Sequence, residues 1–500
     1  MNVISIDLGT SHTYISKGST ESLNTQAVLF DGNSSGMETT LLYCNKPNSP
    51  LISRLATNEF GDSTYEERQQ GNYKFVSHFK PDIVGSKDAQ RYTVDFLRTI
   101  LRDAEKAKIP LFPQSALVII GVPSEASTEY KETLKRLAYE AGYGKVQLID
   151  EPKGALFHEL EQKNLSFEMI MDGLLVIDFG GGTCDFTYLR QGKIEGSWGE
   201  MDLGGRLFDD LFYQWFCEKR PDAKARIEAD QSDFYVRTYD CREMKEKFSD
   251  TMINAKTVLK AASFKTKVGE YGQIKDLTWD EFLQRSRCYT PSESFLRFQR
   301  EAGIAIPEKL RNGPIDLIDW FEKSLINGLK NNNIKHEDIH AISLAGGSSK
   351  WLFVENICIE KFKASAISQS LNPFAAISEG LAVYPALKRE FEVKIQRIQD
   401  GYKHFISGTI FPLLINEMGK CANLIIDGII LELFTSQIKP VLEEFRTTGG
   451  TIVELEDRIA DIARAYEDRL KQIIQDIYEK NIVQLYEIAL VLQRNKHLLR

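Results

Sequence analysis

Three glycine-rich turns hold the residues best suited to chemistry in this chain. Their sequences are IDLGTSHT at 6–13, VIDFGGGTCDFT at 176–187 and SLAGGSSK at 343–350, and each lies at the end of an apolar run. Glycine lets a backbone approach a ligand closely, and consecutive amides in such a turn form a concave site for an anion. The turns therefore predict a binding site for phosphate groups.

Hydroxyl and carboxylate side chains accompany these turns. Hydroxyls can donate hydrogen bonds to phosphate oxygens, and those available belong to Thr10, Ser11, Thr183 and Ser348. Asp7 and Asp178 end the first two apolar runs, where a carboxylate can hold a hydrated Mg²⁺ against the phosphates. Phosphoryl transfer to water needs placement and charge neutralisation rather than a protein nucleophile. The chemistry that these residues favour is therefore nucleotide hydrolysis.

One such turn alone could be an ordinary tight turn after a strand. However, DLGT at 7–10 and DFGGGT at 178–183 repeat one element about 170 residues apart, which predicts two related lobes around a shared cleft. The chain lacks GxxxxGK[ST], which disfavours a P-loop. It also lacks GxGxxG with its downstream acid, which disfavours a dinucleotide-binding dehydrogenase.

The elements that position these turns alternate between strands and helices. Helical patterns at 92–107 and 124–141 separate apolar β-branched runs, which lie at 3–6, 117–120, 174–177 and 341–344. This alternation predicts an α/β fold with a largely parallel sheet.

Changes in composition divide the chain into three parts. We expect a first lobe at 1–171, with a loop-rich insertion at about 20–90, and a second lobe at 172–389, with a helical insertion at about 206–330. A helical domain follows at 390–500. Its apolar residues form a stripe at steps of 3 or 4, namely Ile452, Leu455, Ile459, Ile462, Tyr466, Leu470, Ile473 and Ile477. This stripe is typical of a bundle packed on itself or on the main body, or of a coiled-coil-like docking surface.

Charge and composition restrict the partners. The net charge of −9 disfavours nucleic-acid binding, since phosphates need a basic surface. The seven scattered cysteines form no CxxC pair, and no targeting segment opens the chain, so we expect a cytoplasmic protein without a disulfide framework. Charged residues within the apolar stretch 408–434 disfavour a membrane-spanning helix, so we expect no membrane contact.

In their order, the three turns and five further short segments resemble the seventy-kilodalton heat-shock (DnaK-like) chaperone family, within the actin and sugar-kinase-like ATPase superfamily. The resemblance covers about residues 1–388. Beside the three turns, it rests on VIIGVPSEAS at 118–127 followed by LIDEPKGAL at 148–156, DLGGRLFDD at 202–210, CREMKEKFS at 241–249 and LNPFAAISEGLA at 371–382. It implies a two-lobed actin-like ATPase fold, built from duplicated RNase H-like subdomains with insertions.

The resemblance also implies roles for single residues, with ATP or ADP and Mg²⁺ as cofactors. Residues for catalysis would be Asp7, Lys80, Glu151, Asp178 and Thr183. Mg²⁺ and its waters would be organised by Asp7, Asp178 and Asp185. Nucleotide contacts would come from Gly9, Thr10, Ser11, His12, Gly180, Gly181, Gly182, Thr183, Gly204, Gly205, Lys245, Ser249, Gly346, Gly347, Ser348 and Lys350. Pro123 matches the proline that the family uses as a switch. Lys80 could equally be a surface lysine of the insertion.

Three features depart from the family pattern. Glu246 stands where the adenosine-contacting helix usually offers a basic residue, and Phe374 replaces the carboxylate of the NP-acid motif. After residue 388 there is neither a hydrophobic-acidic linker nor a run of period-two strands for a peptide-binding β-sandwich.

The sequence therefore favours a slowly hydrolysing ATPase whose lobe closure controls what the helical 390–500 region binds. An unknown protein partner is expected there, and self-association is possible. The alternatives are an actin-like filament-forming ATPase, a nucleotide-binding scaffold with little turnover and, with less support, a small-molecule kinase.

Overall fold

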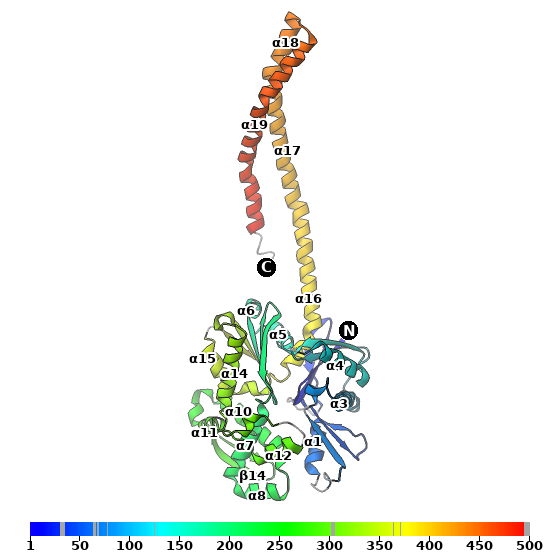
Figure 1. Cartoon of the computed structure of the whole chain (residues 1–500), viewed down its shortest axis with the longest axis vertical. Coiled ribbons are helices and arrows are strands. Elements are labelled where there is room, and N and C mark those ends of the chain that lie inside the picture. The colour runs from blue at the N-terminus through cyan, green and yellow to red at the C-terminus, as the bar shows by residue number, and fades with distance from the viewer. Residues whose placement is uncertain are drawn as a thin grey trace. The chain divides into compact units, whose positions relative to one another are not determined.

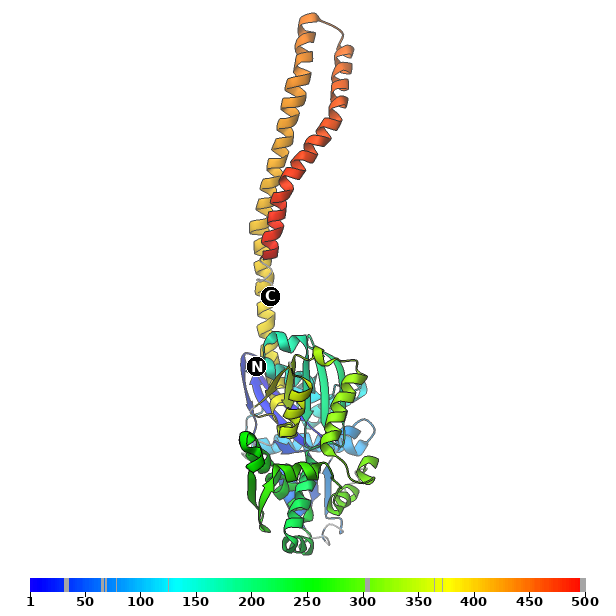
Figure 2. The ribbon, with the colours of Figure 1, turned by 90° about the vertical axis from the view of Figure 1, so that its left-hand side faces the viewer.

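The computed structural model describes residues 1–30, 36–63, 67, 70–77, 79–124, 126–301, 306–363, 365–370 and 372–494. The chain divides into two compact units, Met1–Arg389 and Glu390–Arg500. Each unit is described by itself (Figures 1 and 2).

Two sheets with the same topology form the frame of the first unit. The first sheet has the order β3-β2-β1-β8-β9 (Ser22–Ala27, His12–Ser19, Asn2–Leu8, Leu117–Val122 and Lys145–Asp150), with β4 (Met37–Glu38) also paired to β2. The second has the order β12-β11-β10-β15-β16 (Lys193–Glu200, Cys184–Arg190, Leu174–Phe179, Ala341–Ala345 and Ala366–Gln369). In both, the first strand pairs antiparallel with the next strand and parallel with a later one.

The four predicted apolar strands are confirmed as β1, β8, β10 and β15. These strands lie inside the sheets and are almost entirely buried, because helices cover both faces. The predicted helices correspond to α3 (Lys87–Lys106) and α4 (Thr128–Ala141). Serine side chains cap their N-termini, since Ser86 accepts from the Ala89 N–H and Ser127 from the Tyr130 N–H.

A shared hydrophobic cluster joins the two halves of this unit. It includes Val3 and Ile119 from the first sheet, Leu174 and Val176 from the second, and Leu381. Helix α5 (Glu151–Gln162) meets α16 (Ala376–Phe405) beside it, where a Cβ at Gly154 would lie 2.7 Å from the Ile377 carbonyl oxygen. The cleft between the halves is therefore closed at its base by tight packing.

The insertions are more regular than their composition indicates. The segment at about 20–90, expected to be loop-rich, contains a three-stranded sheet, β6-β5-β7 (Leu51–Ile52, Thr40–Cys44 and Tyr73–Ser77), and helix α1 (Ser53–Asp62). Strands this short give little periodic signal among the Ser, Asn and Gly residues around them. The second insertion is mainly helical, with α7 (Gly205–Lys219), α10 (Cys241–Asn254) and α12 (Glu293–Glu301), but it also holds the hairpin of β13 (Ser263–Val268) and β14 (Gly272–Thr278).

The second unit is a helical hairpin. The end of α16 continues through the π-helical η6 (Ile406–Ile410), α17 (Phe411–Gly428), the π-helical η7 (Ile429–Ile438) and α18 (Lys439–Thr448). Gly449 and Gly450 end this run, and α19 (Ile452–Arg494) returns alongside α17 (Figures 1 and 2). Most of the predicted stripe of α19 faces this contact, where Tyr466 is 3% exposed and its hydroxyl donates to the Gly428 carbonyl (3.3 Å), whereas Ile452 at its start is 69% exposed.

The helical run Ala376–Thr448 contains one window that is long and apolar enough to cross a membrane, by length and composition alone. A core helix of a soluble protein passes the same test, so this window is weak evidence.

Candidate functional site

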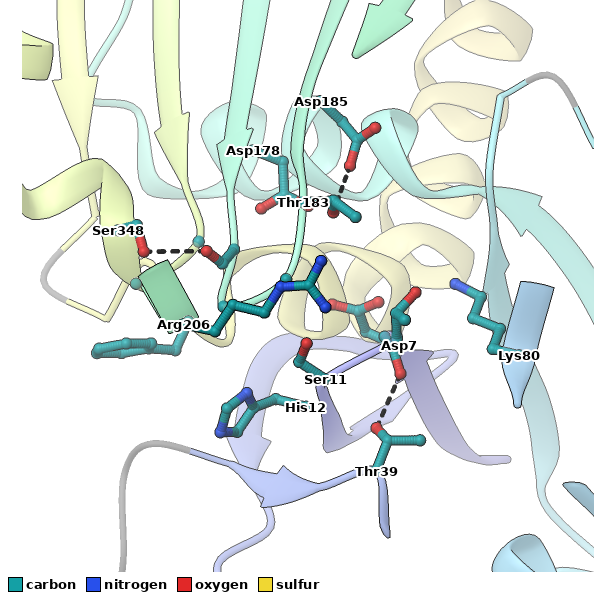
Figure 3. Close-up of a pocket in the computed structure, with 18 of the residues that line it drawn as sticks. Asp7, Ser11, His12, Thr39, Lys80, Asp178, Thr183, Asp185, Arg206 and Ser348 are labelled. Atoms are coloured by element: carbon teal, nitrogen blue, oxygen red, sulfur yellow. Dashed lines mark hydrogen bonds between the residues drawn. The ribbon is translucent and has the colours of Figure 1, made fainter. Parts of the chain in front are cut away.

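A cavity of about 930 Å³ opens between the two sheets of the first unit. The three glycine-rich turns line it, because β1, β10 and β15 end at the same place (Figure 3). The first turn joins β1 to β2, the second joins β10 to β11, and the third follows β15. Two strand–turn–strand elements of equal design therefore face each other across one cavity.

Glycine is required where these turns meet. A Cβ at Gly182 would collide with Ser11 Oγ, and one at Gly181 would lie 3.2 Å from His12 Nδ1. Gly346 has φ = +77°, and its Cβ would lie 2.5 Å from Asp178 Oδ1. A side chain at any of these positions would push the turns apart or fill the space in front of their amides.

Carboxylates gather at the centre of the cavity. Asp178 and Asp185 are directly opposite each other on β10 and β11, an arrangement that is unfavourable for like charges. Burial raises the pKa of Asp178, and the nearby Asp7 carboxylate adds to the rise. Burial also raises the pKa of Asp185 to about 6, although the hydrogen bond from Thr183 Oγ1 (2.8 Å) opposes this. These carboxyl groups therefore lie where a bound cation would stabilise their charged forms.

Asp7 shares this environment. Its pKa rises to about 7, through burial and then through Glu151, while Lys80 opposes the rise. Among the described residues, no three His, Cys, Asp or Glu side chains are placed to hold a metal ion directly. The carboxylates suit an ion that keeps most of its waters, as Mg²⁺ commonly does.

Lys80 and Glu151 form a buried ion pair in the cavity wall. Lys80 Nζ lies 2.8 Å from Glu151 Oε1, and its side chain is only 7% exposed. Burial alone would lower the pKa of Lys80, but Glu151 raises it above its ordinary value. Lys80 is thus a charged group inside the cavity and not a surface lysine.

Comparison with known proteins agrees with the motifs. The chain is 24% identical over 328 residues to "Chaperone protein dnaK1" of Synechocystis sp., covering 64% of this chain and 43% of that protein. It is 23% identical over 394 residues to "Chaperone protein DnaK" of Thermosipho africanus, covering 77% and 59%. A heat shock protein homolog of Encephalitozoon cuniculi is 27% identical over 308 residues, covering 57% and 43%.

The N-terminal part of this chain is a DnaK-like region. The chain spans about half the length of the curated relatives it matches. No protein-family model matches it.

The cavity of the DnaK-like region brings together most of the residues proposed from the sequence. Those that line it are Asp7, Gly9, Thr10, Ser11, His12, Lys80, Pro123, Glu151, Asp178, Gly180, Gly181, Gly182, Thr183, Asp185, Lys245, Ser249, Gly346, Gly347, Ser348 and Lys350. Their placement is compatible with the predicted roles but does not test them.

Gly204 and Gly205 are the exceptions. They do not line the cavity but support the second turn from behind, since the Gly205 N–H donates to the Gly180 carbonyl (3.1 Å) and a Cβ at Gly204 would collide with Gly182. The expectation that they let the backbone approach the ribose and purine stays a prediction, and a Cβ at Gly205 would lie 2.8 Å from Ser348 Oγ of the cavity lining. These glycines are needed for packing between two backbone segments.

Two of the three departures from the family pattern face the cavity. Glu246 is half-buried beside Lys245, and this burial raises its pKa. The Phe374 ring packs so closely on Gly347 that a Cβ there would collide with it, and Lys350 Nζ lies 4.9 Å above the ring centre. Phe374 thus stands where the family pattern has a carboxylate, and Glu246 stands where it has a basic residue.

Several charged residues of the cavity, Arg206 and Glu38 among them, were not proposed from the sequence as site residues. Arg206 follows the Gly204-Gly205 pair, and Figure 3 shows its guanidinium projecting into the space near Ser11 and Thr183. Glu38 comes from β4 and pairs with Arg242 of α10 (2.7 Å), which in turn contacts His12 Nε2 (3.2 Å). The position of Arg206 directly after the glycine pair could have indicated from the sequence that it is a site residue. The contact between Glu38 and Arg242 could not have been found in this way, because nothing in the sequence connects the two positions.

Aromatic rings close the outer side of the cavity. Phe60 and Phe75 of the first insertion contact Phe234 of the second, with ring centres 5.6 and 5.9 Å from it. The Phe298 ring is tilted by 34° against Phe234 at 4.5 Å, and the Arg237 guanidinium lies 5.7 Å from the Phe298 ring. The two insertions therefore meet through an aromatic cluster, Phe60–Phe75–Phe234–Phe298.

Proposed function

We propose that this chain binds ATP and hydrolyses it slowly in the cavity of the first unit, as a heat-shock-70-like ATPase. The observation that carries this proposal is the meeting of three glycine-rich turns, the carboxylates Asp7 and Asp178, and the Lys80–Glu151 pair around one cavity. Amides can hold the phosphates, and the buried ion pair supplies a charge and a water-positioning carboxylate.

The actin-like fold is part of this proposal. Two sheets with the same strand order and directions support a duplicated core, and the cavity lies where the equivalent turns of the two copies meet. A ligand that contacts both copies favours the closed arrangement by its differential affinity for it. The aromatic cluster would be remade at each closure.

Mg²⁺ fits the cavity because three carboxylates lie there, and burial raises the pKa of each of them. A bound cation would stabilise their charged forms. Asp7, Asp178 and Asp185 would hold the ion's waters, and the ion would neutralise the phosphate charge. Thr183 already donates to Asp185, which fixes the orientation of that carboxylate. Arg206 would add a second cation beside the phosphates, opposite Lys80.

The nucleotide state of the ATPase would control what the helical second unit binds. Helix α16 begins at Ala376, within the first unit, and ends at Phe405, within the second, so it offers a continuous connection. We propose that this unit is an interaction domain and not a peptide-binding β-sandwich. Its described residues are helical apart from the turn at 449–451.

A second candidate function is nucleotide binding with little turnover. The Phe374 ring against Gly347 and the Glu246 carboxylate favour it, because both alter the side of the cavity that the resemblance assigns to adenosine. The Lys80–Glu151 pair favours hydrolysis, since a scaffold has no need of a buried lysine there.

Both candidates can be separated with the purified chain and Mg²⁺-ATP. Equilibrium binding measures affinity, and phosphate release measures turnover. We expect Asp178→Ala and Thr183→Ala to slow hydrolysis by about 100-fold or more. Asp222→Ala is the matched control, because that aspartate is exposed and pairs only locally with Arg220. Binding without phosphate release would establish the second candidate, and unchanged turnover in both variants would refute the site assignment.

A further inference from the structure

The outer face of the helical hairpin carries a stripe of exposed apolar side chains. The stripe begins in the last turns of α16, where Phe391, Ile395, Ile398 and Tyr402 follow at steps of 4, 3 and 4. All four side chains are 37% to 52% exposed. This spacing is that of a coiled-coil seam.

The stripe continues along α17 and η7, where its members step by 4, 3, 8, 4 and 4 residues. Ile406 fills the next turn, and the π-helical η6 adds one residue before the pattern resumes. The following members are 49% to 71% exposed, and they are Phe411, Ile415, Met418, Ile426, Ile430 and Phe434. Leu413, Leu424 and Leu431 widen the stripe on its flanks and are also exposed.

This stripe differs from the one on α19. The α19 stripe packs inside the hairpin, around Tyr466 and Gly428. A helix with apolar residues on both its inner and its outer side is normally buried on both. The 391–434 stripe spans about 65 Å at 1.5 Å per residue.

We propose that the 391–434 stripe is a dimerisation surface, and that its occupant is the same stripe of a second copy of this chain. Two identical apolar stripes complement each other along their whole length without burying a charge. They generate a closed two-fold interface, in which each patch meets its own copy. A second copy of this chain carries an apolar stripe of the same length, and such a stripe is what a partner would need.

Charge argues against a lipid surface as the occupant. A helix that binds in a membrane interface needs a polar face rich in Lys and Arg. Here both signs flank the stripe, as in the Lys394–Glu390 pair (2.6 Å), and the whole chain has a net charge of −9.

The hairpin also argues against insertion into a bilayer. Arg469 of α19 donates to both carboxylate oxygens of Glu432 (3.0 and 3.1 Å) beside the stripe. Further along α19, Asp461, Arg464, Glu467 and Lys471 form exposed ion pairs. Carrying these groups into hydrocarbon would be costly.

The test is the mass of the full-length protein by sedimentation and light scattering over a wide concentration range. We expect twice the 56.9 kDa of one chain. Ile415→Lys combined with Met418→Lys should weaken self-association by about 100-fold or more, since it places charges in the seam. Both side chains are at least 65% exposed, so the hairpin should keep its helicity by circular dichroism.

Gln472→Lys combined with Gln475→Lys is the matched control, because both positions are exposed, lie on α19 and not on the stripe, and add the same charge. It should remain dimeric. Flotation with neutral and with anionic phospholipid vesicles completes the test. A dimer that fails to float supports the proposal. A monomer at every concentration, a dimer that survives the stripe substitutions, or capture by either kind of vesicle would overturn it.

Discussion

Lys80 Nζ and Glu151 Oε1 lie 2.8 Å apart in the wall of the cavity, although their residues belong to segments 71 positions apart. The pair is buried and faces Asp7, whose pKa it affects from both sides, since Glu151 raises that pKa and Lys80 lowers it. The charges of Lys80 and Glu151 would therefore both act on the bound phosphates.

Removing the lysine should affect turnover more than binding. We expect Lys80→Met to lower the single-turnover rate of ATP hydrolysis by about 100-fold or more, since a cation placed for the developing charge is lost. ATP affinity should fall much less. Lys131→Met is the control, because Lys131 pairs with Asp150 (3.2 Å) outside the cavity. Normal turnover in Lys80→Met would exclude a role for this pair in hydrolysis.

Arg206 should act mainly on affinity. Burial lowers the pKa of its guanidinium, and Asp202 contacts it at 3.3 Å. We expect Arg206→Met to weaken ATP binding by about tenfold or more, and Arg206→Lys to restore part of the loss. Equilibrium titration with ATP and ADP measures both. If Arg206→Met bound ATP as tightly as the original protein, the guanidinium would not contact phosphate.

The aromatic cluster between the insertions should slow nucleotide release. Phe75→Ala and Phe298→Ala remove rings 5.9 and 4.5 Å from the Phe234 centre, so the closed arrangement loses contact energy. We expect fluorescent ADP to dissociate several-fold faster in stopped-flow displacement. Phe112→Ala, at an exposed position away from the cluster, should leave the rate unchanged. Equal rates in all variants would show that the cluster does not control release.

The sequence predicted those features that depend on local pattern. The strands β1, β8, β10 and β15 and the turns after them follow from apolar runs and glycine spacing, which fix local conformation. The Glu38–Arg242 pair could not be foreseen, because it joins segments that only the tertiary fold brings together. The packing of Gly204 and Gly205 against the second turn could not be foreseen for a similar reason, since sequence shows the need for glycine but not which neighbour causes it.

The C-terminal region shows the same limit. The stripe of α19 was recognised from its spacing, whereas the exposed stripe at 391–434 was not. The π-helical turns of η6 and η7 change the number of residues per turn, so no single period describes that stripe.

A buried histidine should make the first unit sensitive to acid. His158 of α5 is 4% exposed, and burial lowers its pKa to about 4. The unfolded chain, with an ordinary histidine pKa near 6.5, therefore binds more protons than the folded chain between about pH 6.5 and 4. The stability that neutral His158 permits is fully present above this window and is lost as the pH falls through it.

His158→Leu should reduce this loss, so that its unfolding free energy falls less between pH 7 and pH 5 than that of the original protein. His340→Gln, at an exposed position, is the control and should keep the original slope. Urea unfolding followed by tryptophan fluorescence measures the slope. Identical slopes in His158→Leu and the original protein would contradict the assignment.

Two glycines of α16 should respond in opposite directions to the same substitution. Gly380 lies against α5, where an added Cβ would overlap the Gly154 carbonyl, so Gly380→Ala must push two helices apart. We expect it to destabilise the first unit by about 2 kcal/mol or more. Gly401, on the same helix but within the second unit, has no atom near an added Cβ, and Gly401→Ala should raise helix stability by about 0.5–1 kcal/mol.

The two effects can be read separately. All five tryptophans lie between residues 198 and 351, so their fluorescence reports unfolding of the first unit, while far-ultraviolet circular dichroism includes the hairpin. Gly380→Ala should shift the fluorescence transition to lower urea concentration, and Gly401→Ala should leave it in place. Because the two substitutions are chemically identical, a shift in the first and none in the second assigns the cost to the contact between α5 and α16. Equal fluorescence transitions would mean that the two helices can separate at no cost, and the tight crossing at Gly154 would then have no part in holding the halves together.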